Sequence, residues 1–380
     1  TNSEVHEMLK TGFDRSPMFN GAIQSTGPRY CPSIEDKINR FAHRDRHQIF
    51  AEPEGWDTVE YYVNGFSTSL PQEVQAAALK LIPGFENAKM FRPGYAIEYD
   101  YFPPTQLKHS LETKLVENLF FSGQINGTTG YEEAASQGLM AGINAHHKVN
   151  GKDPFILNRS EAYIGVLIDD LITKGTEEPY RMFTSRAEYR ILLRNDNADI
   201  RLTERSNNIG LASDERLRNV EHKIKETDSL FNFIKTTSVE PEKLNPILAE
   251  IDSAPIKQKM KMDNILTRPG MHLAQIKRGS TALTEYLANK DFDTSEVEEQ
   301  AELLIKYAGY IDREREVAEK IERLEYVKIP DDIDYSKFST FSNESKEKLK
   351  AIKPATIGQA SRISGIKPSD VSVLLIHLGR

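Results

Sequence analysis

The pattern of the chain changes near residues 151–158, and this change limits the fold more than any other feature of the sequence. Before it, short β-like runs recur between Glu60 and Phe121, with a helical segment after Pro71. After it, the sequence is charged and follows helical periodicity, without strand-like alternation of comparable quality. A chain of 380 residues also exceeds what one hydrophobic core usually serves. The sequence therefore predicts mixed α/β structure followed by a separate helical part. The β-like runs are 61–63, 96–99 and 119–121.

The second half of the chain predicts long amphipathic helices. Ser213 precedes two acidic residues, which predicts an N-cap followed by favourable charge in the first turn. A further helix is predicted to begin at the capping box of Ser295 and Glu298 and to reach Leu324, with a break only near Arg315. Both helices carry apolar residues at three- and four-residue spacing, so each is expected to bury one face against a neighbour.

The last forty residues predict three short helices that together resemble a small helix-turn-helix unit. Pro354 ends the first, Gly365 ends the second and Pro368 opens the third. A compact helical cap with its own apolar core is favoured over a unit that reads a nucleic-acid groove, because short helix pairs with a glycine turn are common. The expected helices are 343–350, 356–364 and 368–377.

Composition excludes several classes of protein. No 18 consecutive apolar residues occur, so the sequence offers no transmembrane helix. The single cysteine, Cys31, leaves no partner for an intramolecular disulfide and favours the cytoplasm. The net charge of -8 argues against nonspecific coating of nucleic acid, although a local basic face is compatible with it. Because GxGxxG, GxxxxGKS/T and HExxH are all absent, no self-sufficient dinucleotide, P-loop or zinc site is expected.

The most informative stretch is 119–134, which predicts a strand, a glycine-rich turn and a helix start. Gly123, Gly127 and Gly130 let the backbone approach a ligand closely, and the two threonines after Gly127 offer donors together with the free amides of the helix. Small residues line the following helix, which is expected to pack closely on a sheet. From the residues alone, ligand binding and an ordinary strand-to-helix connection are equally supported.

Cys31 lies between two prolines, with Arg29 and Lys37 nearby and a helix expected from Ser33 to Ala42. Neighbouring cations and a helix start lower the pKa of a thiol and raise its thiolate fraction, so a reactive nucleophile is one interpretation. A half-buried cysteine at a loop corner is the other, and it is normally favoured for a solitary thiol.

Arginines are dense between residues 180 and 205. This stretch contains six arginines and four acidic residues, and tyrosine and phenylalanine lie between them. This composition suits phosphate clamping and base stacking in RNA recognition. Salt bridges within a domain explain the same pattern, and the residues alone favour them slightly. The arginines assigned to tRNA binding are Arg181, Arg186, Arg190 and Arg194.

At these three stretches the sequence resembles the MnmG (GidA) family, the flavoproteins of bacterial tRNA wobble-uridine modification. The phrases that carry the resemblance extend along the whole chain and are far more specific than a lone GxGxxG. They are DRSPM at 14–18, GPRYCPSIEDK at 27–37, HQIF at 47–50, RPGYAIEYD at 92–100, and the stretches 123–135, 178–190 and 354–365.

The resemblance implies an α/β plus all-α fold, in which the remainder of an FAD-binding Rossmann-like domain and part of an inserted domain precede a helical C-terminal domain. It also implies that the family's N-terminal dinucleotide fingerprint is not in this chain, which is expected to be a fragment and inactive alone. The expected parts are 1–60 in the inserted, NADH-binding domain, 61–155 in the FAD-binding domain, 156–335 in the helical domain, and 336–380 as a small helical tip.

The resemblance further implies a catalytic Cys31, whose thiolate would add to carbon 6 of uracil and make carbon 5 nucleophilic. Glu35, Asp36 and Lys37 could then serve proton transfer or orientation. The implied FAD residues are Gly123, Gln124, Asn126, Gly127, Thr128, Thr129 and Gly130, with Gln124 a direct contact. The implied NADH residues are Gly27, Pro28, Arg29, Tyr30, Cys31, Pro32, Ser33, Ile34, Glu35, Asp36, Lys37, Ile38, Asn39, Arg40 and Phe41.

In the implied reaction, NADH reduces FAD, and a one-carbon unit from methylene-tetrahydrofolate passes through the reduced flavin to carbon 5 of the wobble uridine. Glycine or ammonia supplies the amino group, so the product carries a carboxymethylaminomethyl or aminomethyl substituent. The implied partners are tRNA, the GTPase MnmE and a second copy in a homodimer, with no membrane. Two rival functions leave features unused: a flavin oxidoreductase on a small molecule does not need the arginines, and a noncatalytic RNA-binding adaptor does not need Cys31.

Overall fold

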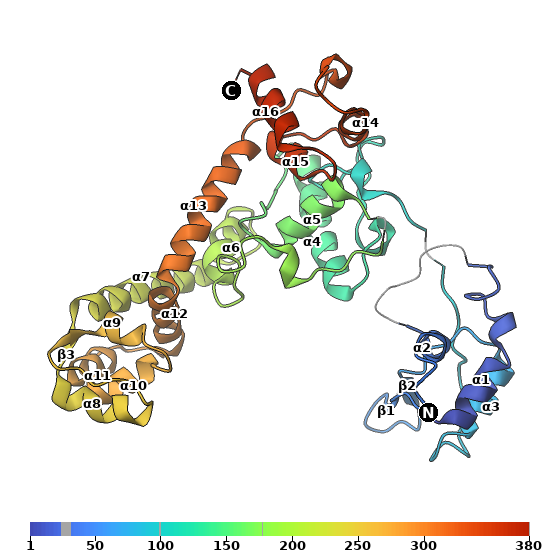
Figure 1. Cartoon of the computed structure of the whole chain (residues 1–380), viewed down its shortest axis with the longest axis horizontal. Coiled ribbons are helices and arrows are strands. Elements are labelled where there is room, and N and C mark those ends of the chain that lie inside the picture. The colour runs from blue at the N-terminus through green and yellow to red at the C-terminus, as the bar shows by residue number, and fades with distance from the viewer. Residues whose placement is uncertain (24–31, 99, 177, 380) are drawn as a thin grey trace. The chain divides into compact units, whose positions relative to one another are not determined.

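The computed structural model describes residues 1–23, 32–98, 100–176 and 178–379, and the chain divides into two compact units. The first unit comprises residues 1–155 and 175–182, and the second comprises 156–174 and 183–380. Short helices, a hairpin and long connections build the first unit, whereas helices dominate the second (Figure 1). Among the described residues, no helix is long and apolar enough to cross a membrane.

Three helices and one hairpin form the start of the first unit. They are α1 (Ser3–Lys10), α2 (Ile34–Arg40), β1 (Phe50–Pro53), β2 (Tyr61–Asn64) and α3 (Gln72–Lys80). Leu9, Ile34 and Ala78 are fully buried in their shared core. Ser33 caps α2 by accepting the amide of Asp36, which confirms the helix predicted there, and α3 confirms the helix predicted after Pro71. The run at 61–63 is confirmed as part of β2.

The rest of the first unit holds α4 (Tyr131–Val149) and the 3₁₀ turns η1 (Phe13–Arg15), η2 (Pro104–Gln106) and η3 (Gly123–Asn126). Two predicted strands are wrong here. Residues 96–98 are irregular, with residue 99 outside the described part, and the run at 119–121 makes only an isolated bridge between Phe120 and Glu112. Asn118, with φ of 65°, turns the chain immediately before that run and prevents a longer ladder.

The expectation that the small residues of α4 pack on a sheet is also wrong within the described chain. Gly138 and Gly142 are exposed, and nothing lies within 4 Å of where a Cβ at either position would be. The helix buries another face instead, which carries Gln137, Met140 and Asn144. The buried face therefore combines polar contacts to loops with the apolar Met140 and Ala141.

The second unit is mostly helical. Before its C-terminal cap, the unit contains α5 (Tyr163–Lys174), η4 (Thr184–Arg186), α6 (Ala198–Asn208), α7 (Asp214–Thr236), β3 (Ser238–Val239), α8 (Pro241–Glu250), β4 (Met260–Lys261), α9 (Met262–Leu266), α10 (Leu273–Gly279), α11 (Thr281–Ala288), α12 (Ser295–Lys306) and α13 (Ala308–Glu325). Helix α7 packs against both α6 and α12, and its Leu230 and Ile234 are fully buried. Ser213 caps α7 by accepting the amide of Arg216, as predicted.

The predicted helix from Ser295 to Leu324 is two helices. The first begins at Ser295 as predicted, but the predicted capping box and the predicted break near Arg315 are wrong. Thr294, not Ser295, is the N-cap residue of α12, and its hydroxyl donates to Glu298 at 2.6 Å. The Ser295 amide instead donates to Asp293 at 3.0 Å. The helix is interrupted at Tyr307, beside the weak helix former Gly309, while α13 continues through Arg315.

The predicted C-terminal cap is confirmed. Its elements are η5 (Tyr335–Lys337), α14 (Asn343–Ile352), α15 (Ile357–Arg362) and α16 (Pro368–His377). Leu349, Ile357 and Leu374 from the three helices are fully buried in one separate core. Lys353, with φ of 50°, ends α14 immediately before Pro354.

Candidate functional site

The glycine-rich turn of the first unit is held by its own backbone and by short polar side chains. η3 opens the turn, Gly127 follows with φ of 76°, and Gly130 precedes α4 with φ of 146°. The Thr128 hydroxyl donates to the Gly123 carbonyl at 2.9 Å. The two threonines therefore play different parts, because Thr128 closes the turn while the Thr129 amide donates to the Tyr180 carbonyl at 2.8 Å.

Gln137, which the sequence did not single out, organises this turn from the second turn of α4. Its side-chain oxygen accepts the Gly123 amide at 3.1 Å and the Asn126 side-chain amide at 2.8 Å. Its nitrogen donates to the Thr128 hydroxyl at 2.9 Å. Gln137 is fully buried, so one side chain fixes both ends of the turn. The available signal in the sequence was a glutamine inside a row of small residues.

The segment 175–182 lies against the same turn. The Tyr180 amide donates to the Gly127 carbonyl at 2.8 Å, and the Met182 amide donates to Glu133 Oε1 at 2.7 Å. The hydroxyls of Tyr101 and Thr176 lie 2.8 Å apart beside Gly127. The structure thus brings the start of the arginine-rich stretch against the glycine-rich stretch, although sequence reasoning treated them separately.

Some polar groups at the turn have no partner. Asn126 Oδ1 and Glu133 Oε2 lack hydrogen-bond partners within the described part of the chain, but they are buried and out of a ligand's reach as they stand. Helix α4 begins without a side-chain cap, so the amides of its first turn are open donors. These donors could hold the polar edge of a planar ring, with Gln124 half-buried alongside.

The stretch assigned to NADH is only partly described. Gly27, Pro28, Arg29, Tyr30 and Cys31 lie outside the described residues, so the structure does not bear on them. The rest of the stretch, from Pro32 to Phe41, forms the capped helix α2 and its flanks, with Ile34 and Ile38 in the core.

Glu35 on α2 is fully buried and ties three segments together. Its Oε1 accepts both the amide and the hydroxyl of Ser69, each at 2.8 Å. The Ser69 hydroxyl lies 2.9 Å from the hydroxyl of Ser16, which is also fully buried. Glu35 Oε2 is buried without a partner among the described residues. The Glu35 carboxylate is therefore suited to orient Ser69 and Ser16, and its Oε2 remains without a hydrogen bond in the part of the chain that the structure describes.

The other two charged residues of α2 are held differently. Lys37 donates to the Gly65 carbonyl at 3.0 Å, which fastens α2 to the loop after β2. Asp36 lies 3.4 Å from Arg40 on the next turn of the helix. Asn39 and Arg40 are exposed on the outer face. Lys37 therefore has a structural contact, and Asp36 a surface ion pair of small energetic weight.

The arginines assigned to tRNA binding do not all belong to one unit. Arg181 lies in the first unit, whereas Arg186, Arg190 and Arg194 lie in the second. Arg190 is exposed. Arg194 is mostly buried, pairs with Asp196 at 3.1 Å and donates to the Ile191 carbonyl at 2.7 Å. Arg194 is therefore already held by partners within the protein, and a tRNA phosphate would bind in addition to them.

Two further arginines of the second unit, Arg159 and Arg362, form salt bridges within the protein. Arg159, which sequence reasoning missed, is buried and contacts Asp169 at 3.1 Å, Asp170 at 2.7 Å and Glu188 at 2.7 Å. Burial alone would lower the pKa of its guanidinium, but Asp170, Glu188 and Asp169 outweigh burial and raise it. Arg362 from α15 reaches the same Asp169 at 2.6 Å, so the network joins the C-terminal cap to α5.

Family models match most of the chain. Residues 1–153 match "Glucose inhibited division protein A", residues 214–315 match "tRNA modifying enzyme MnmG/GidA C-terminal helical domain", and residues 317–380 match "tRNA modifying enzyme MnmG/GidA C-terminal helical bundle". The enzyme "tRNA uridine 5-carboxymethylaminomethyl modification enzyme MnmG" of Christiangramia forsetii is 63% identical over all 380 residues. The chain belongs to the MnmG/GidA family.

Relatives and solved structures of the family extend beyond this chain. The chain spans 61% of the C. forsetii MnmG, and MnmG of Bacteroides thetaiotaomicron is 55% identical over 384 aligned residues with the same 61% share. Aquifex aeolicus GidA in its form II crystal matches with a TM-score of 0.81 and 44% identity, over 100% of this chain and 58% of that one. These matches to MnmG/GidA confirm the predicted fold class, an α/β part followed by a helical C-terminal domain.

The glycine-rich turn of this MnmG/GidA chain should not tolerate a side chain at Gly127. A Cβ there would lie 2.5 Å from Thr176 Oγ1 and 2.8 Å from a ring carbon of Tyr101, at a positive φ. We expect Gly127→Ala to destabilise the turn by about 1–3 kcal/mol. Hydrogen exchange of peptides spanning 120–150 measures this as faster exchange.

Gly138→Ala is the matched control, because open space surrounds that position inside α4. It is expected to slow exchange in the same peptides slightly, since alanine favours the helix by about 0.4–1 kcal/mol. Equal exchange in the Gly127→Ala chain and the unmodified chain would show that the turn is not packed as described.

Proposed function

We propose that this chain is part of an enzyme that modifies carbon 5 of the wobble uridine of tRNA, adding a carboxymethylaminomethyl or aminomethyl group with FAD and NADH. The observation that carries the proposal is the 63% identity, over every residue of the chain, to a protein named for tRNA uridine modification. Such identity extends through both units and does not stop at one shared domain.

The glycine-rich turn supports a flavin at this site. The open amides at the start of α4 suit a flavin ring edge, which carries acceptors. Gln137 would keep the turn preorganised, so binding would cost little reordering. When bound, FAD supplies the redox chemistry that side chains lack.

The stretch 27–41 is proposed for NADH, and Cys31 for the thiolate that activates the uracil ring, with methylene-tetrahydrofolate as the one-carbon donor. Glu35 would act by orienting rather than by direct proton transfer, because its described contacts are to Ser69 and, through it, Ser16. Its open Oε2 could accept one further hydrogen bond when a ligand is present.

The proposed partners are tRNA, the GTPase MnmE and a second copy of the same protein, in the cytoplasm. The helical second unit supports the tRNA proposal through its exposed Arg190 and the arginines around it. A chain with a net charge of -8 repels a polyanion overall, so attraction must come from a local cluster of cations.

Alanine at both Arg186 and Arg190 is expected to weaken tRNA binding and to lower its salt dependence. Loss of two phosphate contacts should reduce the slope of log affinity against log salt by about one to two units. The melting temperature should stay nearly unchanged. Fluorescence anisotropy with labelled tRNA across a salt series, beside a melting curve, measures both quantities.

Arg216→Ala with Arg218→Ala is the matched control, since both arginines are exposed on α7 outside the cluster. It should alter the slope less than the Arg186 and Arg190 pair. If the variant with alanine at Arg186 and Arg190 instead has a lower melting temperature and an unchanged salt slope of tRNA affinity, the arginines are structural and the tRNA assignment fails.

A further inference from the structure

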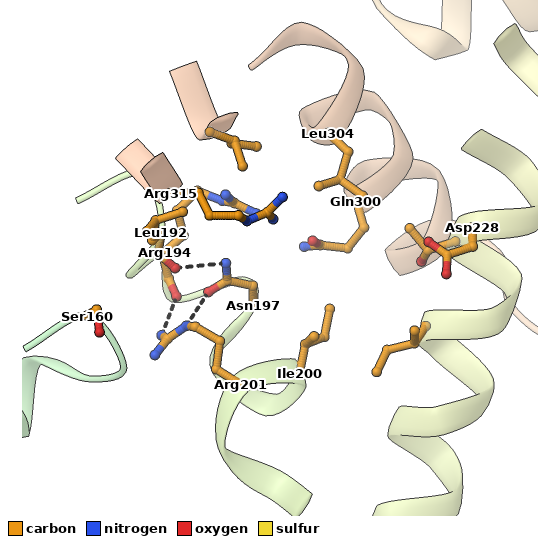
Figure 2. Close-up of a pocket in the computed structure, with 13 residues that line it drawn as sticks. Ser160, Leu192, Arg194, Asn197, Ile200, Arg201, Asp228, Gln300, Leu304 and Arg315 are labelled. Atoms are coloured by element: carbon orange, nitrogen blue, oxygen red, sulfur yellow. Dashed lines mark hydrogen bonds between the residues drawn. The ribbon is translucent and has the colours of Figure 1, made fainter. Parts of the chain in front are cut away.

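A cavity of about 350 Å³ lies within the second unit, among α6, α7, α12, α13 and the loop before α6. Figure 2 shows Arg315 and Gln300 extending toward one central space, with Leu304 and Ile200 bordering it. Pockets of about this size accommodate small organic ligands. Of the residues assigned above to a function, only Arg194, assigned to tRNA binding, lines this cavity.

The walls of the cavity are largely apolar. Aliphatic surface comes from four helices and the loop before α6, through Leu192, Ile200, Ile224, Leu304 and Ile311. Aliphatic walls on several sides suit a flat ring better than a second charged group, because a ring replaces water with dispersion contacts.

One hydroxyl in the lining has no partner. Thr227 on α7 is 3% exposed, and its Oγ1 makes no hydrogen bond within the residues that the structure describes. A threonine inside a helix normally donates to the carbonyl one turn back, so an open buried hydroxyl is costly. Because the oxygen itself is buried, a ligand carbonyl or ring nitrogen in the cavity would satisfy it only after the Thr227 side chain rotates toward the cavity.

The lining holds three cations, Arg194, Arg201 and Arg315, and one carboxylate, Asp228, although Arg194 is paired with Asp196 at 3.1 Å outside the lining. Burial, and after it repulsion from Arg194, lower the pKa of Arg201. Arg315 is exposed and lies 3.8 Å from Asp312. An anionic group at this position would relieve the repulsion.

The polar part of the lining is held in place by hydrogen bonds. Asn197 donates to the Leu192 carbonyl at 3.1 Å and accepts from Arg201 at 2.8 Å, as Figure 2 shows. Gln300 donates to Asp196 at 2.7 Å. These groups therefore need little rearrangement before binding, which favours a specific site.

We propose that this cavity binds one nucleotide, with its base among the aliphatic walls near Thr227 and its phosphate at Arg315. A nucleotide combines a flat ring bearing acceptors with an anionic phosphate, and the cavity offers a counterpart to each. The nucleotide comes either from bound tRNA, as an unstacked residue, or from solution as a mononucleotide. The tRNA source rests on the proposed function, whereas the mononucleotide source does not.

The test uses the whole 380-residue chain and three variants. Leu304→Trp fills the cavity, Thr227→Val removes only the hydroxyl, and Arg315→Gln removes the exposed cation. Arg313→Gln is the matched control, because it removes an exposed cation from the same helix outside the lining. The probes are tRNA carrying 4-thiouridine, for crosslinking and affinity, and uridine and adenosine monophosphates, for direct titration.

For the tRNA source, crosslinks should fall on peptides of α7 or α12, and Leu304→Trp should lower tRNA affinity about tenfold. Thr227→Val and Arg315→Gln should lower it severalfold, and more than Arg313→Gln. For the mononucleotide source, a monophosphate should bind saturably and lose binding in the same three variants. Melting curves identify any variant that fails to fold. If Leu304→Trp does not fold, binding to Thr227→Val decides the test, because valine has nearly the same side-chain volume as threonine.

The proposal is overturned if Leu304→Trp and Thr227→Val leave crosslinks, tRNA affinity and monophosphate binding unchanged. That failure differs from failure of the proposed function, since the chain would still bind tRNA through the Arg186 and Arg190 cluster. If the chain binds no tRNA at all, the proposed function fails, and the monophosphate titration alone decides the cavity.

Discussion

Replacing Cys31 by serine in a full-length enzyme that carries this chain is expected to abolish wobble-uridine modification while leaving FAD content and fold intact. Carbon 5 of uracil is a poor nucleophile until a nucleophile adds to carbon 6, and a serine hydroxyl is almost never ionised near neutral pH. Serine keeps the approximate size of cysteine, so the loss is one of chemistry. Nucleoside analysis of tRNA from a strain that carries only the variant measures the result.

Flavin absorbance and tRNA affinity of the same variant are the controls, and both should match the unmodified enzyme. Near-normal amounts of the modified nucleoside would show that Cys31 is a structural residue. The preference for the unreactive interpretation of a solitary cysteine would then have been right, and another group would have to activate the ring.

Replacing Arg159 by methionine is expected to destabilise the second unit by about 3 kcal/mol or more. The change leaves Asp169 and Asp170, each 1% exposed, without their central cation. Arg362 and Lys174 still contact these carboxylates, so the loss falls toward the lower end of what breaking a buried ion pair costs. Urea unfolding followed by far-ultraviolet circular dichroism measures it, because helices dominate this unit.

Arg313→Met is the control for Arg159→Met, since the exposed Arg313 should change stability by less than about 0.5 kcal/mol. Adding Asp170→Asn to Arg159→Met should recover part of the loss, because it removes a buried carboxylate that has lost its contact with Arg159 and keeps its ion pair with Lys174. A single Arg159→Met variant as stable as the unmodified chain would contradict the buried network.

Local signals were sufficient for most helices of the second unit. Ser213, Pro354 and Pro368 act within one turn of their own position, so their effects can be read from neighbouring residues. The break at Tyr307 was misplaced because apolar spacing continues across it, and spacing alone does not distinguish one bent helix from two. The run at 119–121 fails as a strand because its pairing with Glu112 stays a single bridge, and periodicity does not show how far a pairing extends.

The candidate site was predictable only where its residues are close in sequence. The glycine-rich turn was predicted from its own residues. Gln137 and Tyr180, which hold it, lie 14 and 51 residues from the turn residues that they contact. Arg159 was missed for the same reason, since Asp169, Asp170 and Glu188 converge on it only after folding. Long-range polar networks depend on the packing of elements, and no single stretch of sequence contains that information.

A chimeric enzyme tests the central claim most directly. This chain would replace the aligned 61% of the Christiangramia forsetii MnmG, which supplies the remaining sequence, in a bacterial strain that lacks its own enzyme of this family. The account predicts that mass spectrometry of digested tRNA detects carboxymethylaminomethyl- or aminomethyl-uridine at the wobble position, at a level close to that given by the intact relative. Unmodified wobble uridine from a chimera that is folded, abundant and able to bind FAD would contradict the account.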